Sequence, residues 1–288
     1  MDTALHARLH VAENLARDAG RLLGEYAVKQ ARGDNLAIDT KTSLTDPVSD
    51  ADRASEQLIV AGLRSAFPHD GIVAEENGEA VAGTSGYRWV IDPLDGTVNF
   101  LHGIPQWCVS IACLDADGPV VGVVYTFAAD ELFTAVRGHG ARLNDAGLSI
   151  TENRPLRDCL IATGFSYEVA VRDVQAKELA ELLAHVRDVR RSGAAALDLC
   201  FVAAGRVAAY FEMSLQPWDW AAGMLIVTEA KGTVRSFLRH TEGKERQLVI
   251  AGPEEVVDVL CEFQRRHAPL RPVTLGEVLD AISREPAA

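Results

Sequence analysis

The sequence predicts a layered fold of the α/β or α+β class. Three observations lead to this prediction. Amphipathic helical patterns occur near both ends of the chain, short β-prone segments follow one another through 88–136, and strand-like and helical segments alternate from 160 onward. Because each apolar face of a sheet or helix must be buried against another layer, this order favours two sheets sandwiched by helices.

Two helices and a short strand are expected first. Residues 4–27 place leucine and alanine near a 3.6-residue period, which is typical of a helix with one buried face. Ser49 and Asp52 resemble a capping box, which predicts a second helix ending near Phe67. The apolar run 72–74 then predicts a strand.

The segment 88–136 predicts an antiparallel meander. Its β-prone runs are separated by Asp-Gly and Ala-Asp pairs, which favour turns. These runs are 109–114, 120–125 and 131–135.

The second half of the chain alternates between the two kinds of element. The expected strands are 160–163, 207–211 and 248–251. The expected helices are 171–186, 195–204, 219–230 and 254–267. Pro155 marks a boundary, so we divide the chain into an N-terminal half, 1–155, a C-terminal half, 156–268, and a tail, 269–288.

The composition excludes some classes of function. The 288 residues are 48% hydrophobic and 24% charged, which is ordinary for a globular protein, but the net charge is −13. An acidic surface repels phosphate backbones, so nucleic acid is not expected as the main partner. An anionic substrate would need local positive charge, for which bound metal ions are the obvious source.

The compartment is predicted from the cysteines and the apolar segments. Five cysteines without a Cys-x-x-Cys pair indicate free thiols in a reducing environment. The N-terminus carries charged residues where a signal peptide needs an apolar core, and the most apolar stretch, 194–211, is interrupted by Asp198 and Arg206. We therefore expect a cytoplasmic protein that has no membrane partner.

The most informative segment is Trp89-Val-Ile-Asp-Pro-Leu-Asp-Gly-Thr-Val-Asn-Phe100. Its apolar run ends in two acids, Asp92 and Asp95, and Gly96 and Thr97 follow where a helix is expected to begin. Acids at a strand end can hold hard cations, and backbone N–H groups at a helix start can hold an anion. The segment therefore indicates an enzyme with a metal-assisted phosphate site.

Six acids lie where an expected element begins or ends: Asp46, Glu75, Asp92, Asp95, Glu212 and Asp219. Together they would form an oxygen-rich cage suited to Mg²⁺ or Mn²⁺, and zinc is disfavoured because no His/Cys cluster is present. Taken singly, each acid has a simpler interpretation. Asp219 could cap a helix, Asp95 could be a turn residue, and Glu75 could be one of a solvated pair.

The combination of motifs resembles the inositol monophosphatase family of lithium-sensitive, magnesium-dependent phosphatases. The segment 92–97 fits the family's Asp-Pro-(Ile/Leu)-Asp-Gly-Thr signature, and 218–223 fits its Trp-Asp-x-Ala-(Ala/Gly)-Gly signature. Glu75-Glu76 fits its upstream acidic pair, and 46–52 resembles its Asp-x-Val-Thr-x-x-Asp segment. The four matches occur in the family order and cover roughly residues 5–266.

The resemblance implies a layered α-β-α-β-α sandwich of the sugar phosphatase type and a metal-dependent phosphomonoesterase. It assigns Glu75, Asp92 and the carbonyl of Leu94 to a first Mg²⁺. It assigns Asp92, Asp95 and Asp219 to a second Mg²⁺, and a weaker third site near Glu75 is implied as well. Mn²⁺ could replace Mg²⁺ at these sites.

The resemblance also implies the catalytic roles. A water activated by metal would attack the phosphate, with Thr97, paired with Asp46, helping to orient and deprotonate that water, and with Glu75 beside it. The backbone N–H groups of Gly96 and Thr97 would bind phosphate oxygens.

On the substrate side, 191–196 resembles the family's Gly-(Ser/Thr)-Ala-Ala turn, and 210–212 resembles its (Tyr/Phe)-(Tyr/Phe)-Glu segment. Asp95, Ala195 and Glu212 are therefore expected to contact the substrate. Glu212 favours a polyol, such as myo-inositol monophosphate or a similar sugar phosphate. Fructose 1,6-bisphosphate and histidinol phosphate stay open as alternatives, as does a regulatory role with a protein or RNA partner. The resemblance further implies a homodimer and inhibition by lithium.

Overall fold

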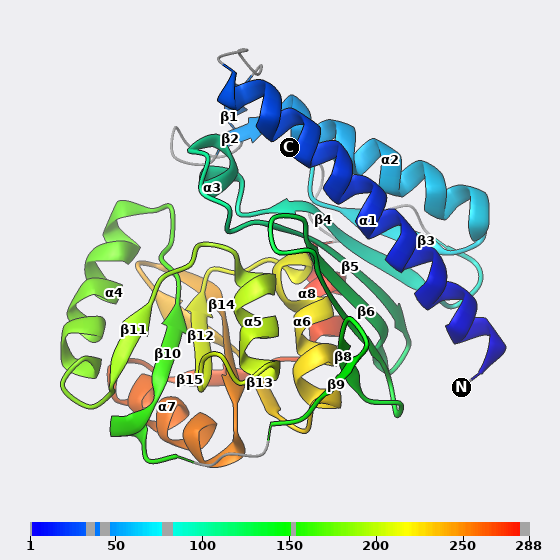
Figure 1. Ribbon diagram of the computed structural model, residues 1–288. Helices are drawn as coiled ribbons and strands as arrows, with labels where there is room; N and C mark the ends of the chain where they lie inside the picture. The colour runs from blue at the N-terminus through cyan, green and yellow to red at the C-terminus, as the bar shows by residue number, and fades with distance from the viewer. Residues whose placement is uncertain (1, 33–37, 41–46, 77–82, 151–153, 283–288) are drawn as a thin grey trace.

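The structure is a computed structural model that describes residues 2–32, 38–40, 47–76, 83–150 and 154–282, without the side chains of 38–40 and 47–49. Two sheets and three helical layers alternate in the order α-β-α-β-α (Figure 1). The layered α/β fold expected from the sequence is confirmed.

The first helical layer consists of α1 (Thr3–Ala31) and α2 (Asp50–Ala66), which lie side by side on one face of the larger sheet (Figure 1). Small and branched apolar residues of both helices, among them Ala16, Leu23 and Ile59, are buried against that sheet. The capping-box expectation gives the start of α2 to within a residue.

The larger sheet has seven strands in the order β3-β4-β5-β6-β7-β8-β9. β3 runs parallel to β4, and the remaining pairs are antiparallel, which confirms the expected meander. The strands are β3 (Gly71–Ala74), β4 (Arg88–Asp95), β5 (Cys108–Asp115), β6 (Gly118–Thr126), β7 (Glu131–Val136), β8 (Ala141–Leu143) and β9 (Ala146–Leu148). The single-turn helix α3 (Thr97–Leu101) follows β4, and the strands β1 (Ile38–Thr40) and β2 (Pro47–Ser49) form a separate antiparallel pair.

The smaller sheet has six strands in the order β11-β10-β12-β14-β13-β15. The strands are β10 (Leu160–Thr163), β11 (Asp188–Arg190), β12 (Ala209–Met213), β13 (Thr233–Thr241), β14 (Lys244–Gly252) and β15 (Leu270–Pro272). Its outer face is covered by α4 (Val169–Leu182) and α7 (Glu254–His267), and a 3₁₀ turn, η1 (Leu156–Asp158), precedes β10.

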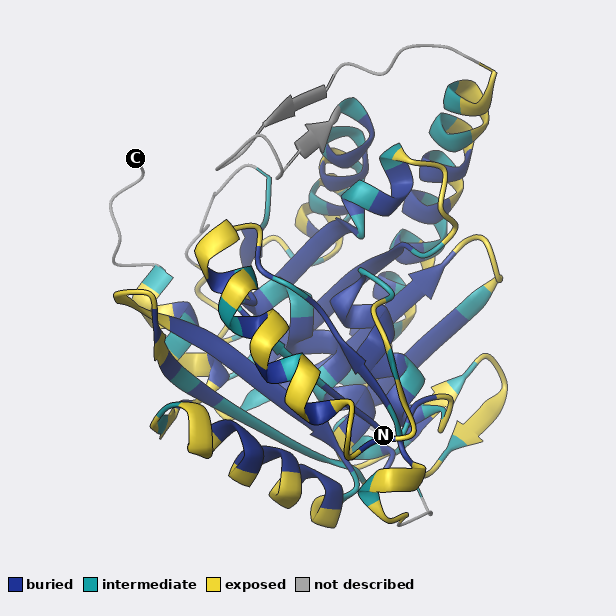
Figure 2. Cartoon of the chain, turned by 90° about the vertical axis from the view of Figure 1, so that its left-hand side faces the viewer, coloured by how far each residue is buried: buried dark blue, intermediate teal, exposed yellow. Residues whose placement is uncertain are grey.

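The central layer contains α5 (Ala195–Ala203) and α6 (Pro217–Glu229), packed between the two sheets. Figure 2 shows that the outer helices expose one face, whereas the strands are mostly buried. α8 (Leu275–Ile282) packs beside α6 through Leu275 and Leu279. Residues that the sequence left as a tail therefore add both a strand and a helix to the fold.

Three further expectations concern the cysteines, membrane-spanning helices and the division of the chain into two halves. All five cysteines are free and buried, as predicted. No helix in the described residues has the length and apolar character that a membrane span requires. The two sheets lie on either side of Pro155 in the sequence, whereas the division into an N-terminal and a C-terminal half stays a prediction.

Candidate metal and phosphate site

Two of the acids predicted for the metal site, Glu75 and Asp92, lie at the same end of two adjacent strands of the larger sheet. β3 and β4 pair in parallel up to Ala74 and Ile91, so Glu75 and Asp92 follow the last paired residues of two adjacent strands. Parallel strands bring such residues to the same edge of a sheet, as at the ligand sites of α/β proteins.

The end of β4 has an irregular backbone that displays its acids. The pairing of β4 with β5 shifts register between Asp92 and Asp95. Within this bulge, Asp92 Oδ1 accepts a hydrogen bond of 3.0 Å from the Leu94 N–H. Gly96 follows with a φ of +94°, and a Cβ there would lie 2.8 Å from the carbonyl oxygen of Gln106. Glycine is therefore required by both the backbone angle and the close packing.

Two helix starts hold the other acids. Asp95 accepts hydrogen bonds from the N–H groups of Ala195, at 3.2 Å, and Ala196, at 2.8 Å, at the beginning of α5. Asp219, in the first turn of α6, accepts from the Gln216 N–H at 2.7 Å as part of a capping box. The positive end of a helix stabilises a carboxylate, so each acid is fixed from the central helical layer.

These carboxylates repel one another. Burial, followed by the charges of Glu75 and Asp95, raises the pKa of Asp92 well above its usual range. Burial and the same two neighbours raise the pKa of Asp219. Burial also raises the pKa of Asp95 to about 6, although the Ala196 and Ala195 N–H groups act in the opposite direction. A buried group of like charges is costly unless cations neutralise it.

The donor set fits a hard divalent cation. Glu75, Asp92, Asp95 and Asp219 offer oxygen ligands only, as Mg²⁺ and Mn²⁺ prefer. Within the described residues, no three His, Cys, Asp or Glu side chains converge on one point as a complete cage. The charges of Glu75, Asp95 and Asp219 all raise the pKa of Asp92, so the four acids are neighbours although they do not meet at a single point.

Thr97 has a different acidic partner from the one expected. Its hydroxyl lies 3.0 Å from Asp52 Oδ1, to which it donates, and 3.1 Å from the Leu94 carbonyl oxygen. Asp52 is only 1% exposed and belongs to α2. Asp46, the predicted partner, lies outside the described residues.

Sequence reasoning missed Asp52 as a site residue. Its segment contains three acids, Asp46, Asp50 and Asp52, and the spacing alone does not tell which of them reaches Thr97. The signal was the position of Asp52 on the apolar stripe of α2, one turn before the buried Ser55 and two turns before Ile59. An acid on the buried face of a helix needs a polar partner.

Glu212 lies in β12, where its Oε2 accepts a hydrogen bond of 2.9 Å from the Tyr210 hydroxyl. Burial raises the pKa of Glu212 to about 7, although Tyr210 and Arg191 lower it. Gly164, just after β10, lies against this carboxylate. A Cβ at Gly164 would lie 2.0 Å from Glu212 Oε2, so the missing side chain makes room for the acid.

Asp198 is a second missed residue beside Glu212. It lies between Leu197 and Leu199 in α5 and is 1% exposed. The Ser192 hydroxyl donates to its Oδ1, whereas its buried Oδ2 has no hydrogen-bond partner among the residues that the structure describes. Burial raises the pKa of Asp198 to about 8, and the charge of Glu212 adds to that effect.

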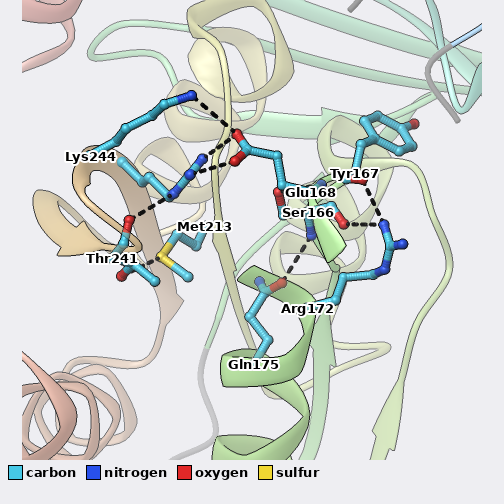
Figure 3. Close-up of polar contacts among 9 residues, drawn as sticks. Ser166, Tyr167, Glu168, Arg172, Gln175, Met213, Thr241 and Lys244 are labelled. Carbon is cyan, nitrogen blue, oxygen red and sulfur yellow. Dashed lines mark hydrogen bonds and ion pairs between the residues drawn. The ribbon is translucent and has the colours of Figure 1, made fainter. Parts of the chain in front are cut away.

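The loop that carries Gly164 is braced on two sides (Figure 3). From α4, Gln175 Oε1 accepts from the Ser166 N–H at 3.0 Å, and Arg172 donates to the carbonyls of Ser166 and Tyr167. From β14, Arg246 makes two 2.8 Å hydrogen bonds to the Glu168 carboxylate. These contacts fix the loop that borders Glu212.

The model of the inositol monophosphatase family matches residues 5–267. A protein of Pasteurella multocida named Nus factor SuhB is 41% identical over 262 residues, covering 90% of this chain and 97% of the relative. A Mycobacterium bovis protein named inositol-1-monophosphatase is also 41% identical, over 273 residues, covering 90% of this chain and 94% of the relative.

A solved structure shows the same fold as this chain. The extragenic suppressor protein suhB of Bartonella henselae superimposes with a TM-score of 0.80 and 40% identity, covering 89% of this chain and 98% of that one. The family match covers every predicted site residue, from Asp46 to Asp219. The chain therefore belongs to the inositol monophosphatase family.

Proposed function

We propose that the protein is a Mg²⁺-dependent phosphomonoesterase that hydrolyses myo-inositol monophosphate or a similar polyol or sugar phosphate. The observation that carries the proposal is the cluster of Asp92 and Asp95, both buried, with Asp219 and Glu75 beside them. Burial, followed by the charges of the neighbouring acids, raises the pKa of Asp92 and of Asp219, and a bound divalent cation would offset the cost of holding these like charges together.

The proposed metal positions follow from the oxygen atoms that these residues offer. Glu75, Asp92 and the Leu94 carbonyl would hold one Mg²⁺, and Asp92, Asp95 and Asp219 a second, with a weaker third near Glu75. When bound, these ions would supply Lewis acidity and lower the pKa of a water near the phosphate. Mn²⁺ would bind the same oxygen ligands.

Thr97 and Asp52 would take up the proton of the attacking water. The hydroxyl of Thr97 can pass its proton toward Asp52 Oδ1, 3.0 Å away, while it takes one from the attacking water. The N–H groups of Gly96 and Thr97 would bind phosphate oxygens. Because α3 is a single turn, these local N–H groups matter more here than a helix dipole.

Glu212 would select the substrate by accepting hydrogen bonds from ring hydroxyls, with Asp95 and the backbone of Ala195 beside it. An acid at this position favours a polyol over a substrate with a second anionic group. Fructose 1,6-bisphosphate and histidinol phosphate stay alternatives, because the metal site would serve all three.

The direct test is phosphate release from a panel of myo-inositol 1-phosphate, glycerol 2-phosphate, fructose 1,6-bisphosphate, histidinol phosphate and adenosine 3′,5′-bisphosphate. Each substrate is assayed with Mg²⁺ and with EDTA. Turnover that requires Mg²⁺ and is fastest on a polyol phosphate supports the proposal. A fastest reaction on fructose 1,6-bisphosphate or histidinol phosphate would overturn the choice of substrate.

The proton route can be tested separately by Asp52→Asn. The amide cannot take the Thr97 proton, so kcat should fall about 100-fold or more while the melting temperature stays near that of the wild type. Asp46→Asn is the matched variant of the residue that the sequence suggested. A larger loss of kcat in Asp46→Asn than in Asp52→Asn would contradict the assignment.

A regulatory role is the second candidate, and the names of the relatives favour it, since one is called a Nus factor. The intact acids of the metal site and the net charge of −13 count against RNA binding as the main role. Capture of a specific protein or RNA at physiological salt by the Asp92→Asn variant would support this role. The homodimer and inhibition by lithium stay predictions.

A further inference from the structure

The face of α2 that is turned toward the site continues beyond Asp52. Ser55 and Glu56 lie three and four residues after Asp52, so the three side chains share one face of the helix. Ser55 is 0% exposed and Glu56 1% exposed. Ile59 and Leu63 continue the same stripe with apolar side chains. The stripe is thus polar only over the turns that face the site.

Glu56 holds the turn that carries Glu75. Its Oε2 accepts a hydrogen bond of 2.7 Å from the Glu76 N–H. The pairing of β3 with β4 ends at Ala74, so this turn lies beyond the last pair of the sheet. The hydrogen bond to Glu56 therefore fixes this turn, which the backbone pairing of β3 with β4 does not reach.

Ser55 holds the bulge in β4. Its hydroxyl donates to the carbonyl oxygen of Pro93 at 2.8 Å. Pro93 lies between Asp92 and Asp95, where the pairing of β4 with β5 shifts register. A buried carbonyl that leaves a sheet ladder needs another donor, and α2 provides it.

We infer that Ser55 and Glu56 are positioning residues for the metal ligands, through their hydrogen bonds to the backbone at Pro93 and Glu76. The inference rests on the proposed metal-dependent function. Burying the Glu56 carboxylate is costly, and the hydrogen bond from the Glu76 N–H offsets part of that cost. Its benefit is that Glu75 stays beside Asp92 although the two acids repel each other.

Supporting groups that orient metal ligands commonly change metal affinity 10–100-fold when they are removed. Glu56→Ala should therefore weaken binding of Mn²⁺, used as the probe, by about 10–100-fold. Glu56→Gln keeps an oxygen that can accept from the Glu76 N–H, so its affinity should stay close to that of the wild type. Ser55→Ala should weaken binding in the same direction.

The experiment titrates Mn²⁺ into each purified variant, without substrate, and follows free Mn²⁺ by electron paramagnetic resonance. Leu63→Ala is the matched control, because it loosens α2 two turns away without touching the site. It should lower the melting temperature and leave the Mn²⁺ affinity unchanged. If Glu56→Ala does not fold, Ser55→Ala decides by the same criteria.

Two results would overturn the inference. The first is an unchanged Mn²⁺ affinity in Glu56→Ala, or in Ser55→Ala where that variant decides. The second is an equal loss of affinity in Leu63→Ala or in Glu56→Gln, which would indicate general loosening of the helix or a role of the Glu56 charge. If wild-type protein binds no Mn²⁺, the proposed function itself fails, and the two failures are therefore distinguishable.

Discussion

Asp198 is a buried acid next to Glu212, the acid proposed to select the substrate, and one of its oxygens has no hydrogen-bond partner in the described part of the chain. Burial raises its pKa from 3.8 in the unfolded chain to about 8. The folded protein therefore holds a proton there that the unfolded chain releases near pH 4. The free energy of unfolding consequently falls as the pH rises from about 4 to 8.

Asp198→Asn should remove this pH dependence. The amide cannot ionise, and it still accepts from the Ser192 hydroxyl. At pH 8–9 the variant should melt several degrees above the wild type, and near pH 4 the difference should vanish. The measurement is the melting temperature of both proteins from pH 4 to 9, with Asp117→Asn on an exposed turn as the control. A difference that does not change with pH would contradict the assignment.

At the residue scale, the sequence predicted those acids whose neighbours have a distinctive pattern. Glu75, Asp92, Asp95 and Asp219 flank strands or helices next to apolar residues, and the charges of the other three all raise the pKa of Asp92, so the four are neighbours, whereas their role as metal ligands stays a prediction. Asp52, Ser55 and Glu56 could not be found this way, because their partners are backbone atoms or hydroxyls 20 to 45 residues distant. Only folding determines such pairs.

At the scale of elements, α6 is placed by a close contact with the larger sheet. Gly122 in β6 lies directly under α6, and a Cβ there would come within 2.8 Å of the Ala222 carbonyl oxygen. Because that oxygen belongs to the backbone, it cannot rotate away as a side chain would. The position of α6, and with it Asp219, depends on this contact.

Gly122→Ala should therefore destabilise the protein by about 1–3 kcal/mol, as overpacking does. It should also weaken Mn²⁺ binding, because α6 carries Asp219. Thermal unfolding and Mn²⁺ titration check both effects. Gly147→Ala is the control, since a Cβ at Gly147 meets no atom of the described residues within 4 Å. Equal stability of the two variants would argue against the contact.

The central helices α5 and α6 were predicted from apolar runs that end near a glycine, Gly205 and Gly232, whereas β13 was missed. Its sequence, TVRSFLRHT, places polar residues on both faces, so no simple alternation is visible. The strand is stabilised instead by pairing along its whole length with β14 and by β15 on its other edge. Such support comes from distant segments and leaves no local pattern.

For the whole molecule, a net charge of −13 and a buried group of acids both work against the folded state. A divalent cation that binds only the folded protein stabilises it by about 2.7 kcal/mol when its free concentration is about 100 times its Kd. Mg²⁺ should therefore raise the melting temperature by several degrees, and EDTA should reverse the shift. An equal shift with NaCl at the same ionic strength would indicate charge screening instead.

The most direct test of the proposed metal site is Asp92→Asn, which removes the acid shared by both proposed metal positions. Mn²⁺ binding and phosphate release from the best substrate are measured on the same folded sample. We expect the Mn²⁺ affinity to fall and turnover to drop by more than about 100-fold, the upper range for residues that only support ligands. Turnover close to that of the wild type would contradict a catalytic site at these carboxylates.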